Sequence, residues 1–215
     1  MYKSGNQDEY FSELFICKLG EKLGFDMAHY EMDGGYIRTK NFTEGTYCHF
    51  EPMSALMGAN DDYNDCFDMI SSISPALVEQ YLRILWLDSI CYNMDRHTEN
   101  FGFLRDVQTG KILKMAPNYD NNIALISRGY PRSVKREEDG LIRFFKEFIL
   151  SNHAARNMVR SMEIPEITEK MICECFAEIP IEADRTFVKE FILNGQKILR
   201  KTVAEEAEVN YCENG

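Results

Sequence analysis

Two short polar segments hold the residues of this sequence that could do chemistry together. The first reads NMDRHTENFGFLRD (residues 93–106) and follows an apolar run, and the second reads APNYD (residues 116–120). An aspartate on a loop can orient and deprotonate a hydroxyl group, while amide and carboxylate oxygens are ligands for Mg²⁺. Phosphoryl transfer needs both functions. Asp95 suits the first role, and Asn100 and Asp120 suit the second.

The sequence between the two segments predicts that they meet in space. Residues 101–104 and 111–115 are typical of two short strands, and the residues from Asp106 to Gly110 are typical of the turn between them. Because a hairpin returns the chain to its starting point, Asp120 is expected to come back beside Asp95 and Asn100.

Each of these residues also has a purely structural interpretation. Aspartate and asparagine are favoured in turns and at helix ends, so Asp95 and Asn100 would end a helix and Asp120 would begin a turn. Arg96 would meet either a phosphate or an acidic side chain. Asp88 lies on an otherwise apolar helical pattern and is expected to brace the loop that follows.

The order DRHTEN (residues 95–100), hairpin, APNYD (residues 116–120) resembles the HipA-like serine/threonine kinases, the toxin kinases of bacterial toxin-antitoxin systems. The resemblance implies ATP and Mg²⁺ as cofactors, a protein hydroxyl as acceptor, and a small helix-turn-helix antitoxin as partner. It implies Asp95 as catalytic base, with Asn100 and Asp120 on the magnesium. His97 joins this catalytic set, chiefly as a hydrogen-bonding residue that fixes the loop.

The resemblance extends upstream to the expected nucleotide site. Lys3, after an expected strand, would touch the ATP phosphates, and Glu13 on the next helix would be its ion-pair partner. The segment from Lys40 to Glu44, with Lys40 and Phe42 as candidates, would lie near the hinge that holds adenine.

One departure from the family pattern leaves two other functions open. HipA-like kinases carry strands and a glycine-containing loop before the ATP lysine, whereas this sequence begins two residues before Lys3. A partner chain would then supply that part, or the reading frame is truncated, or the protein is a noncatalytic pseudokinase. Phosphoinositide kinases also carry a DRHxxN loop, but they follow it with a HxDFG-type motif where this sequence has APNYD, which favours the HipA-like interpretation over a lipid kinase.

Composition narrows the function classes further. The net charge is −11, which disfavours direct contact with nucleic-acid phosphates. The sequence lacks an apolar run of the roughly 18 residues that a membrane span needs, and its N-terminus lacks the apolar core of a signal peptide. We therefore expect a cytoplasmic protein without membrane contact. The seven cysteines form no CxxC pair, so buried, reduced thiols are expected.

Hydrophobic periodicity predicts an α+β protein with most of its helices in the second part. A helix is expected over residues 9–24, followed by strands over 27–32 and 36–42 that Asp33-Gly34-Gly35 joins. Residues 51–70 are mixed, with helical turns. A mostly buried helix opens at Ser74-Pro75, and further helices are expected over 141–151, 154–162, 167–177 and 185–206.

Pattern and resemblance together imply a protein-kinase-like, HipA-type fold. We expect a truncated N-lobe at residues 1–45, with one helix and a short antiparallel sheet. Residues 46–215 are expected to form a mainly helical C-lobe that carries the catalytic loop and the metal-binding aspartate. The nucleotide would lie between the two lobes.

Overall fold

The computed structural model describes residues 1–43 and 47–212, and the side chains up to residue 204. Within that part the chain forms a mixed α/β fold with eight α-helices and two small sheets. The strands are β1 (Tyr2–Lys3), β2 (Tyr30–Asp33), β3 (Tyr36–Thr39), β4 (Cys48–Pro52), β5 (Gly102–Asp106) and β6 (Ile112–Met115). The helices are α1 (Gln7–Lys22), α2 (Ser54–Met57), α3 (Tyr63–Ile73), α4 (Pro75–Cys91), α5 (Gly140–Ser151), α6 (His153–Ser161), α7 (Glu169–Ala177) and α8 (Arg185–Cys212).

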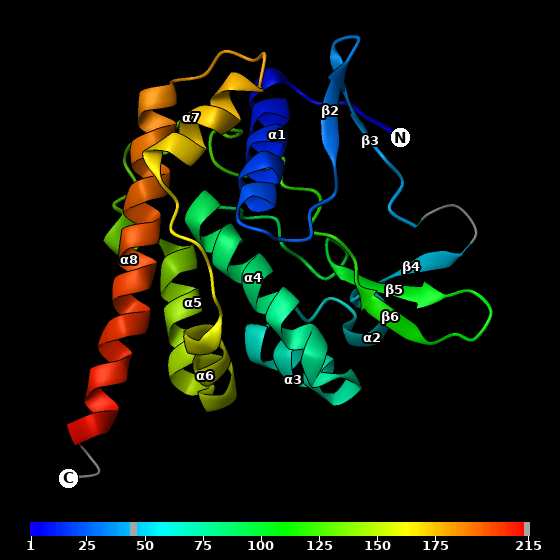
Figure 1. The fold of residues 1–215 in the computed structure, drawn as a ribbon, viewed down its shortest axis with the longest axis vertical. Coiled ribbons are helices and arrows are strands. Elements are labelled where there is room, and N and C mark those ends of the chain that lie inside the picture. Colours follow the sequence, from blue (N-terminus) through cyan, green and yellow to red (C-terminus); the bar gives the residue numbers. More distant parts are fainter. Residues whose placement is uncertain (44–46, 213–215) are drawn as a thin grey trace.

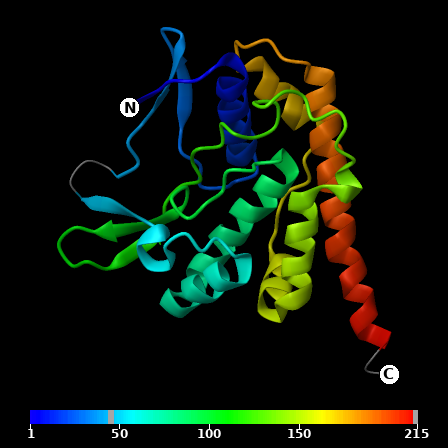
Figure 2. The same cartoon turned by 180° about the vertical axis from the view of Figure 1, so that it is seen from behind.

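The sheets and the longer helices occupy different sides of the molecule. The antiparallel sheets β1-β3-β2 and β4-β5-β6 lie on one side, and α8 runs along the other (Figure 1). Seen from behind, α5 and α6 lie next to α8 (Figure 2), and α4 packs against α3, α5 and α8. None of the described helices is both long and apolar enough to cross a membrane.

Helix α1 begins two residues earlier than its apolar pattern predicts, because a capping box precedes it. The Asn6 side chain accepts a hydrogen bond from the Glu9 amide at 3.0 Å, and the Glu9 carboxylate accepts one from the Asn6 amide at 3.0 Å. These two bonds satisfy donors that a helix start otherwise leaves open. After the helix, Gly24 has φ +74°, a conformation that glycine adopts without strain.

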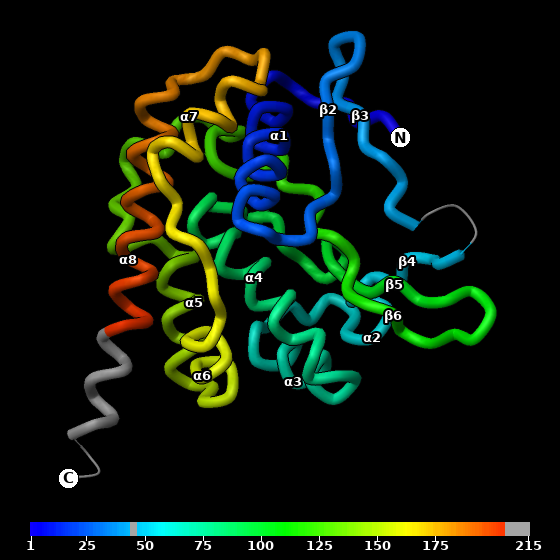
Figure 3. The backbone as a smooth tube through the Cα atoms, viewed as in Figure 1, coloured from blue at the N-terminus to red at the C-terminus, as the bar shows by residue number. Residues whose placement is uncertain are grey.

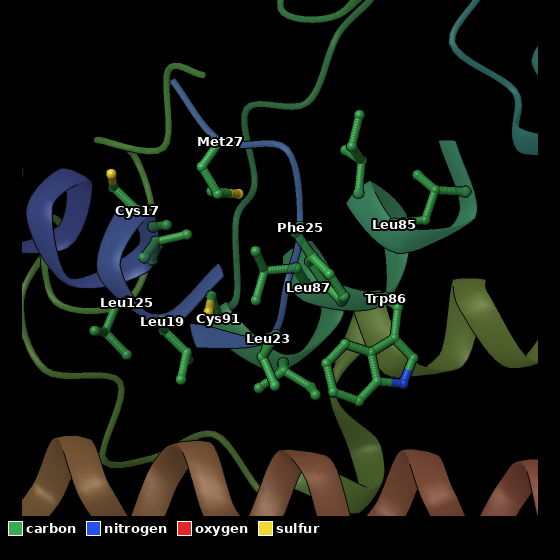
Figure 4. Close-up of a cluster of buried hydrophobic side chains, with 14 of the residues drawn as sticks. Cys17, Leu19, Leu23, Phe25, Met27, Leu85, Trp86, Leu87, Cys91 and Leu125 are labelled. Carbon is green, nitrogen blue, oxygen red and sulfur yellow. The ribbon is translucent and has the colours of Figure 1, made fainter. Parts of the chain in front are cut away.

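The apolar core joins α1 to α4 and to the segment between α1 and β2. Figure 4 shows Leu19 and Leu23 from α1 and its C-cap facing Leu87 and Cys91 of α4. All four are at most 2% exposed, and full burial of a leucine contributes about 1.5–3 kcal/mol. The core includes residues on both sides of position 45, and the division into lobes at that position stays a prediction.

The long connection from β6 to α5 passes α1 (Figure 3) and is bonded to it. The Ser12 hydroxyl donates to the Ala124 carbonyl at 2.7 Å, and the Asn121 amide donates to Glu13 Oε1 at 2.9 Å. The second polar segment is therefore fixed against the first helix of the chain.

The strand predictions are correct in type but not in extent. The β2–β3 hairpin forms at Asp33-Gly34-Gly35, but β2 begins at Tyr30 rather than at residue 27, and β3 ends at Thr39 rather than at residue 42. After β3 the chain turns, and the Asn41 side chain accepts a hydrogen bond from the Thr43 amide. Strand β4 (Cys48–Pro52), which pairs with β5, was not predicted. Its sequence CHFEP shows little alternation and ends in proline, so its pairing with a distant strand determines its conformation.

The described cysteines match the expected reduced thiols. None of Cys17, Cys48, Cys66, Cys91, Cys173 and Cys175 is in a disulfide, and all but Cys173 are buried. Cys173 and Cys175 lie on different faces of α7, as a core role for the second one requires. Cys212 lies where side chains are not described.

Candidate active site

A buried arginine joins the two polar segments. Arg96 donates to both carboxylate oxygens of Asp88, at 2.8 and 3.0 Å, and both side chains are 3% exposed. The other terminal nitrogen of Arg96 donates to the backbone carbonyls of Asn100 at 2.7 Å and Tyr119 at 2.8 Å. One guanidinium thus holds the DRHTEN loop and the APNYD segment together, and the predicted meeting of the two segments is confirmed.

Asparagine side chains complete this network. Arg96 Nη2 also donates to Asn118 Oδ1 at 2.9 Å and to Asn121 Oδ1 at 2.7 Å, and Asn93 Nδ2 donates to Asp88 Oδ1 at 2.9 Å. Burial disfavours the charged guanidinium, but Asp88 outweighs that effect, so the pKa of Arg96 lies above its ordinary value. The prediction that Asp88 braces the loop is confirmed, and Arg96 pairs with an acid.

The loop presents Asp95 and Asn100 differently. Asn100 is buried, and its Nδ2 donates to the Asp95 carbonyl at 2.8 Å and lies 3.2 Å from His97 Nε2. These contacts use the amide nitrogen, which leaves the Asn100 Oδ1 lone pairs for another partner. Asp95 is half-buried, and His97 is exposed. The contact between His97 and Asn100 agrees with a loop-fixing role for the histidine, while a direct part in catalysis stays a prediction.

Lys3 meets Asp120 across 117 residues of sequence and also pairs with Glu13. Lys3 Nζ donates to Glu13 Oε2 at 2.7 Å and also to Asp120 Oδ1. The expected ion pair of Lys3 with Glu13 is therefore present. Asp120 adopts φ +59°, a left-handed conformation that non-glycine residues rarely take and that aspartate tolerates better than most. Such a conformation aims the carboxylate toward β1 and is typical of functional positions.

Burial and charge act against each other at this ion pair. Burial raises the pKa of Glu13 above its ordinary value, although Lys3 opposes the change. For Lys3, burial disfavours the ammonium, but Glu13 and Asp120 outweigh it and raise its pKa. Lys3 is therefore fully protonated near neutral pH and presents a fixed positive charge at the edge of the first sheet.

The donor set fits one Mg²⁺ ion that relies on phosphate for its remaining ligands. Asn100 Oδ1 and the Asp120 carboxylate are hard oxygen ligands, and Mg²⁺ commonly takes one or two protein ligands together with phosphates and water. Within the described residues there is no group of three or more His, Cys, Asp or Glu side chains placed to hold a metal by themselves. These side chains would hold a magnesium that enters with a nucleotide, and an all-protein metal cage is not formed in the described part.

The structure describes both expected hinge residues, Lys40 and Phe42. Lys40 follows β3 and is exposed. Phe42 is half-buried, with its ring centroid 5.9 Å from that of Phe50 and 5.5 Å from that of Tyr119. Phe42 thus contacts the APNYD segment through Tyr119. The role of both residues at adenine stays a prediction, and Glu44 lies outside the described residues.

Comparison with solved structures finds two proteins of similar fold. The structure of a proinflammatory kinase, CtkA, of Helicobacter pylori is similar with a TM-score of 0.60 at 18% identity, over 99% of this chain and 90% of that one. HipA of Shewanella oneidensis MR-1, solved with HipB and operator DNA, is similar with a TM-score of 0.52 at 14% identity. That match covers 90% of this chain and 56% of the HipA chain. No curated protein sequence matches.

A family model that matches the sequence identifies the family of this chain. The HipA-like C-terminal domain matches residues 2–178, which include both polar segments, Lys3 and Glu13. The chain belongs to the HipA-like C-terminal domain family.

Several residues of the site were not singled out by their sequence pattern. Asn93, Asn118 and Asn121 all bond within the Arg96 network, yet isolated asparagines next to a loop are typical of turns. The available signal was their position, since each lies within a few residues of Asp95 or Asp120. Tyr119 was part of the quoted motif, but its hydroxyl bond to the Glu99 carbonyl at 2.5 Å was not expected.

Proposed function

We propose that this protein is an ATP- and Mg²⁺-dependent protein serine/threonine kinase of the HipA type. The observation that carries the proposal is the convergence of Lys3, Glu13 and Asp120 beside a loop that Arg96 fixes to the same segment. A lysine paired with a glutamate, together with a metal-binding aspartate and a loop aspartate and asparagine, is the set that kinases use.

The proposed reaction transfers the γ-phosphoryl group of ATP to the acceptor hydroxyl. The acceptor hydroxyl oxygen forms a bond to the γ-phosphorus while the bond from that phosphorus to the bridging oxygen breaks, and ADP leaves. The Asp95 carboxylate orients the hydroxyl and receives its proton. Lys3, held by Glu13, binds phosphate oxygens and offsets their charge. Magnesium, held by Asn100 Oδ1 and Asp120, would neutralise charge on the phosphates.

A helix-turn-helix antitoxin is the proposed partner. The Shewanella HipA neighbour is in a complex with HipB and operator DNA, and this chain shares its fold. The net charge of −11 favours a partner that supplies the DNA contact, since the chain itself would repel phosphate.

Calorimetric titration with ATP, with and without Mg²⁺, tests the nucleotide site. We expect Mg²⁺-dependent binding in the wild type and its loss in Asp120→Ala. Glu169→Ala is the matched control, because Glu169 also pairs with a lysine, Lys189 at 3.0 Å, but on α7, which carries no residue of the candidate site. Absence of binding to a folded wild-type chain would contradict the proposal and favour a noncatalytic member of the family.

Asp95→Asn separates binding from transfer. The variant removes the proton acceptor but keeps the size of the side chain, so ATP should bind as in wild type while phosphoryl transfer falls about 10²–10⁴-fold. Phosphorylation of protein in a lysate with radiolabelled ATP measures the transfer. If Asp95→Asn and Asp120→Ala lose binding equally, both residues merely hold the loop together.

A further inference from the structure

A cavity of about 620 Å³ opens next to the catalytic loop. Its wall is built from the start of α3, the residues 93–97 and one face of α5. Asp95 and His97 belong to this wall, whereas Lys3, Glu13, Asn100 and Asp120 do not. Asp95 is thus reached from the cavity on one side, and the candidate nucleotide residues lie outside it. The volume is in the range of sites that enclose a small molecule or a few side chains.

The wall of the cavity is acidic. Asp61, Asp62, Asp95 and Glu147 line it, and the arginine on the same wall, Arg96, is already neutralised by Asp88. Asp62 is used in the fold, since its Oδ1 accepts from the Asn64 and Asp65 amides at the start of α3. The other three carboxylates, those of Asp61, Asp95 and Glu147, could meet a ligand in the cavity.

Glu147 is only weakly engaged by a neighbouring cation. Its carboxylate lies 3.7 Å from Arg143, and both side chains are more than 60% exposed. Exposed pairs of this kind contribute little to stability, so a cation from outside can compete for Glu147. Asp61, which precedes α3, is exposed and also lines the cavity.

The same wall also carries exposed apolar side chains. Met94 is 46% exposed and Phe144 is 49% exposed, although both are large and hydrophobic. Behind them, Phe148 is buried, with its ring 5.8 Å from that of Tyr63 in an edge-on contact. Exposed apolar side chains around an acidic hollow are typical of a surface that binds a ligand with both kinds of group.

We propose that this cavity binds the acceptor segment of the protein substrate, and that it selects a serine or threonine with a cationic side chain and an apolar side chain near it. Asp61 and Glu147 would bind the cation, Met94 and Phe144 would contact the apolar group, and Asp95 would meet the hydroxyl. This inference rests on the proposed kinase function, and it adds which acceptors the enzyme takes.

Fluorescence anisotropy with short labelled peptides tests the binding without catalysis. The probe is a peptide with a central serine, arginine on one side and leucine on the other, and its matched peptide carries glutamate in place of the arginine. We expect the basic peptide to bind at least about tenfold more tightly than the acidic one, because attraction to the wall becomes repulsion.

Charge reversal in the wall should remove that preference. The double variant Asp61→Lys, Glu147→Lys is expected to bind the basic peptide about tenfold more weakly, and Phe144→Ala should weaken both peptides. Asp68→Lys is the control, since Asp68 is an exposed carboxylate of α3 outside the cavity wall. Equal affinity of wild type for both peptides, or an unchanged preference in the double variant, would overturn the inference.

A parallel assay separates this inference from the proposed function. Mg²⁺–ATP binding is measured on the same variants, and it should be unchanged in the double variant. If the wild type binds ATP and transfers phosphate but without preference for the basic peptide, the inference fails and the kinase function stands. If the wild type prefers the basic peptide but does not bind ATP, the kinase function fails and the cavity is a peptide-binding site alone.

Discussion

Two buried arginines lie at the end of α4, and they differ in how completely they are bonded. Arg96 binds Asp88 from the helix itself, and Arg136 binds Asp139 from the turn before α5. Arg136 also donates to the Ile90 carbonyl at 2.7 Å and the Ser89 carbonyl at 3.1 Å, which lie at the C-terminal end of α4. One arginine thus fixes the candidate active site and the other fixes the helix that carries it.

The pKa values of the two guanidiniums move in opposite directions. Burial lowers the pKa of Arg136, and Asp139 does not overcome the effect, whereas Asp88 more than offsets burial at Arg96. Asp139 is shared, because it also accepts from the Leu141 amide at 2.8 Å, and Arg136 Nε has no hydrogen-bond partner among the described residues. All three nitrogens of the Arg96 guanidinium donate a hydrogen bond, so the difference teaches that a buried charge is held firmly where each of its donors is bonded.

The largest effect is expected from removal of the carboxylate at the better-bonded arginine. Asp88→Ala leaves the Arg96 charge buried without its partner, so we expect a loss of about 3–5 kcal/mol in the free energy of unfolding, measured in urea. Glu79→Ala is the control on the same helix, since Glu79 is exposed in its pair with half-buried Arg83 and should contribute at most about 1 kcal/mol. Equal effects of the two variants would contradict the special role of Asp88.

Arginine-to-lysine variants at the two sites distinguish their roles. Lysine keeps the charge but cannot make the forked contacts of a guanidinium, so each variant should lose about 2–3 kcal/mol of stability. Arg96→Lys should also weaken Mg²⁺–ATP binding, because the Asn100 and Tyr119 carbonyls lose a shared donor. Arg136→Lys should leave nucleotide binding unchanged at a temperature where both variants are folded. Loss of nucleotide binding in both would mean that the two networks are not separate.

The smallest expected effect comes from the packing around Arg136. A Cβ on Gly195 of α8 would overlap the Arg136 guanidinium, which lies 3.9 Å from the Phe191 ring centroid. Gly195→Ala should therefore cost about 1–2 kcal/mol of stability without change in the Arg96 network. Gly140→Ala, where a Cβ meets no atom within 4 Å, should be neutral or slightly stabilising. Thermal unfolding of both variants measures the difference.

The sequence predicted much of the candidate site because its information is local. The two polar segments, their order and the hairpin between them all lie within 28 residues, from position 93 to position 120. The pairing of Lys3 with Glu13 and the support of the loop by Asp88 were also expected, and both contacts are present. The chemical roles of these residues stay predictions, which the nucleotide titrations above test.

Features that depend on distant parts of the chain were missed. Arg136 stands in the run KREEDG, which has the composition of an exposed turn, yet it is 5% exposed because α4 and α8 close over it. Strand β4 was missed since its partner β5 lies about fifty residues later. Neither is encoded in the residues beside it, and both become visible only when the helices and strands are assembled.

The shared attachment of Asn100 and Tyr119 to one guanidinium has a mechanical consequence. The residues proposed to accept the proton and to hold the metal belong to one stiff unit, anchored in α4 through Asp88. A displacement of either segment is transmitted to the other. On the side of the first sheet, by contrast, Asp120 is contacted by two side chains, Lys3 of β1 and the Tyr30 hydroxyl of β2, so its attachment there depends on side chains alone.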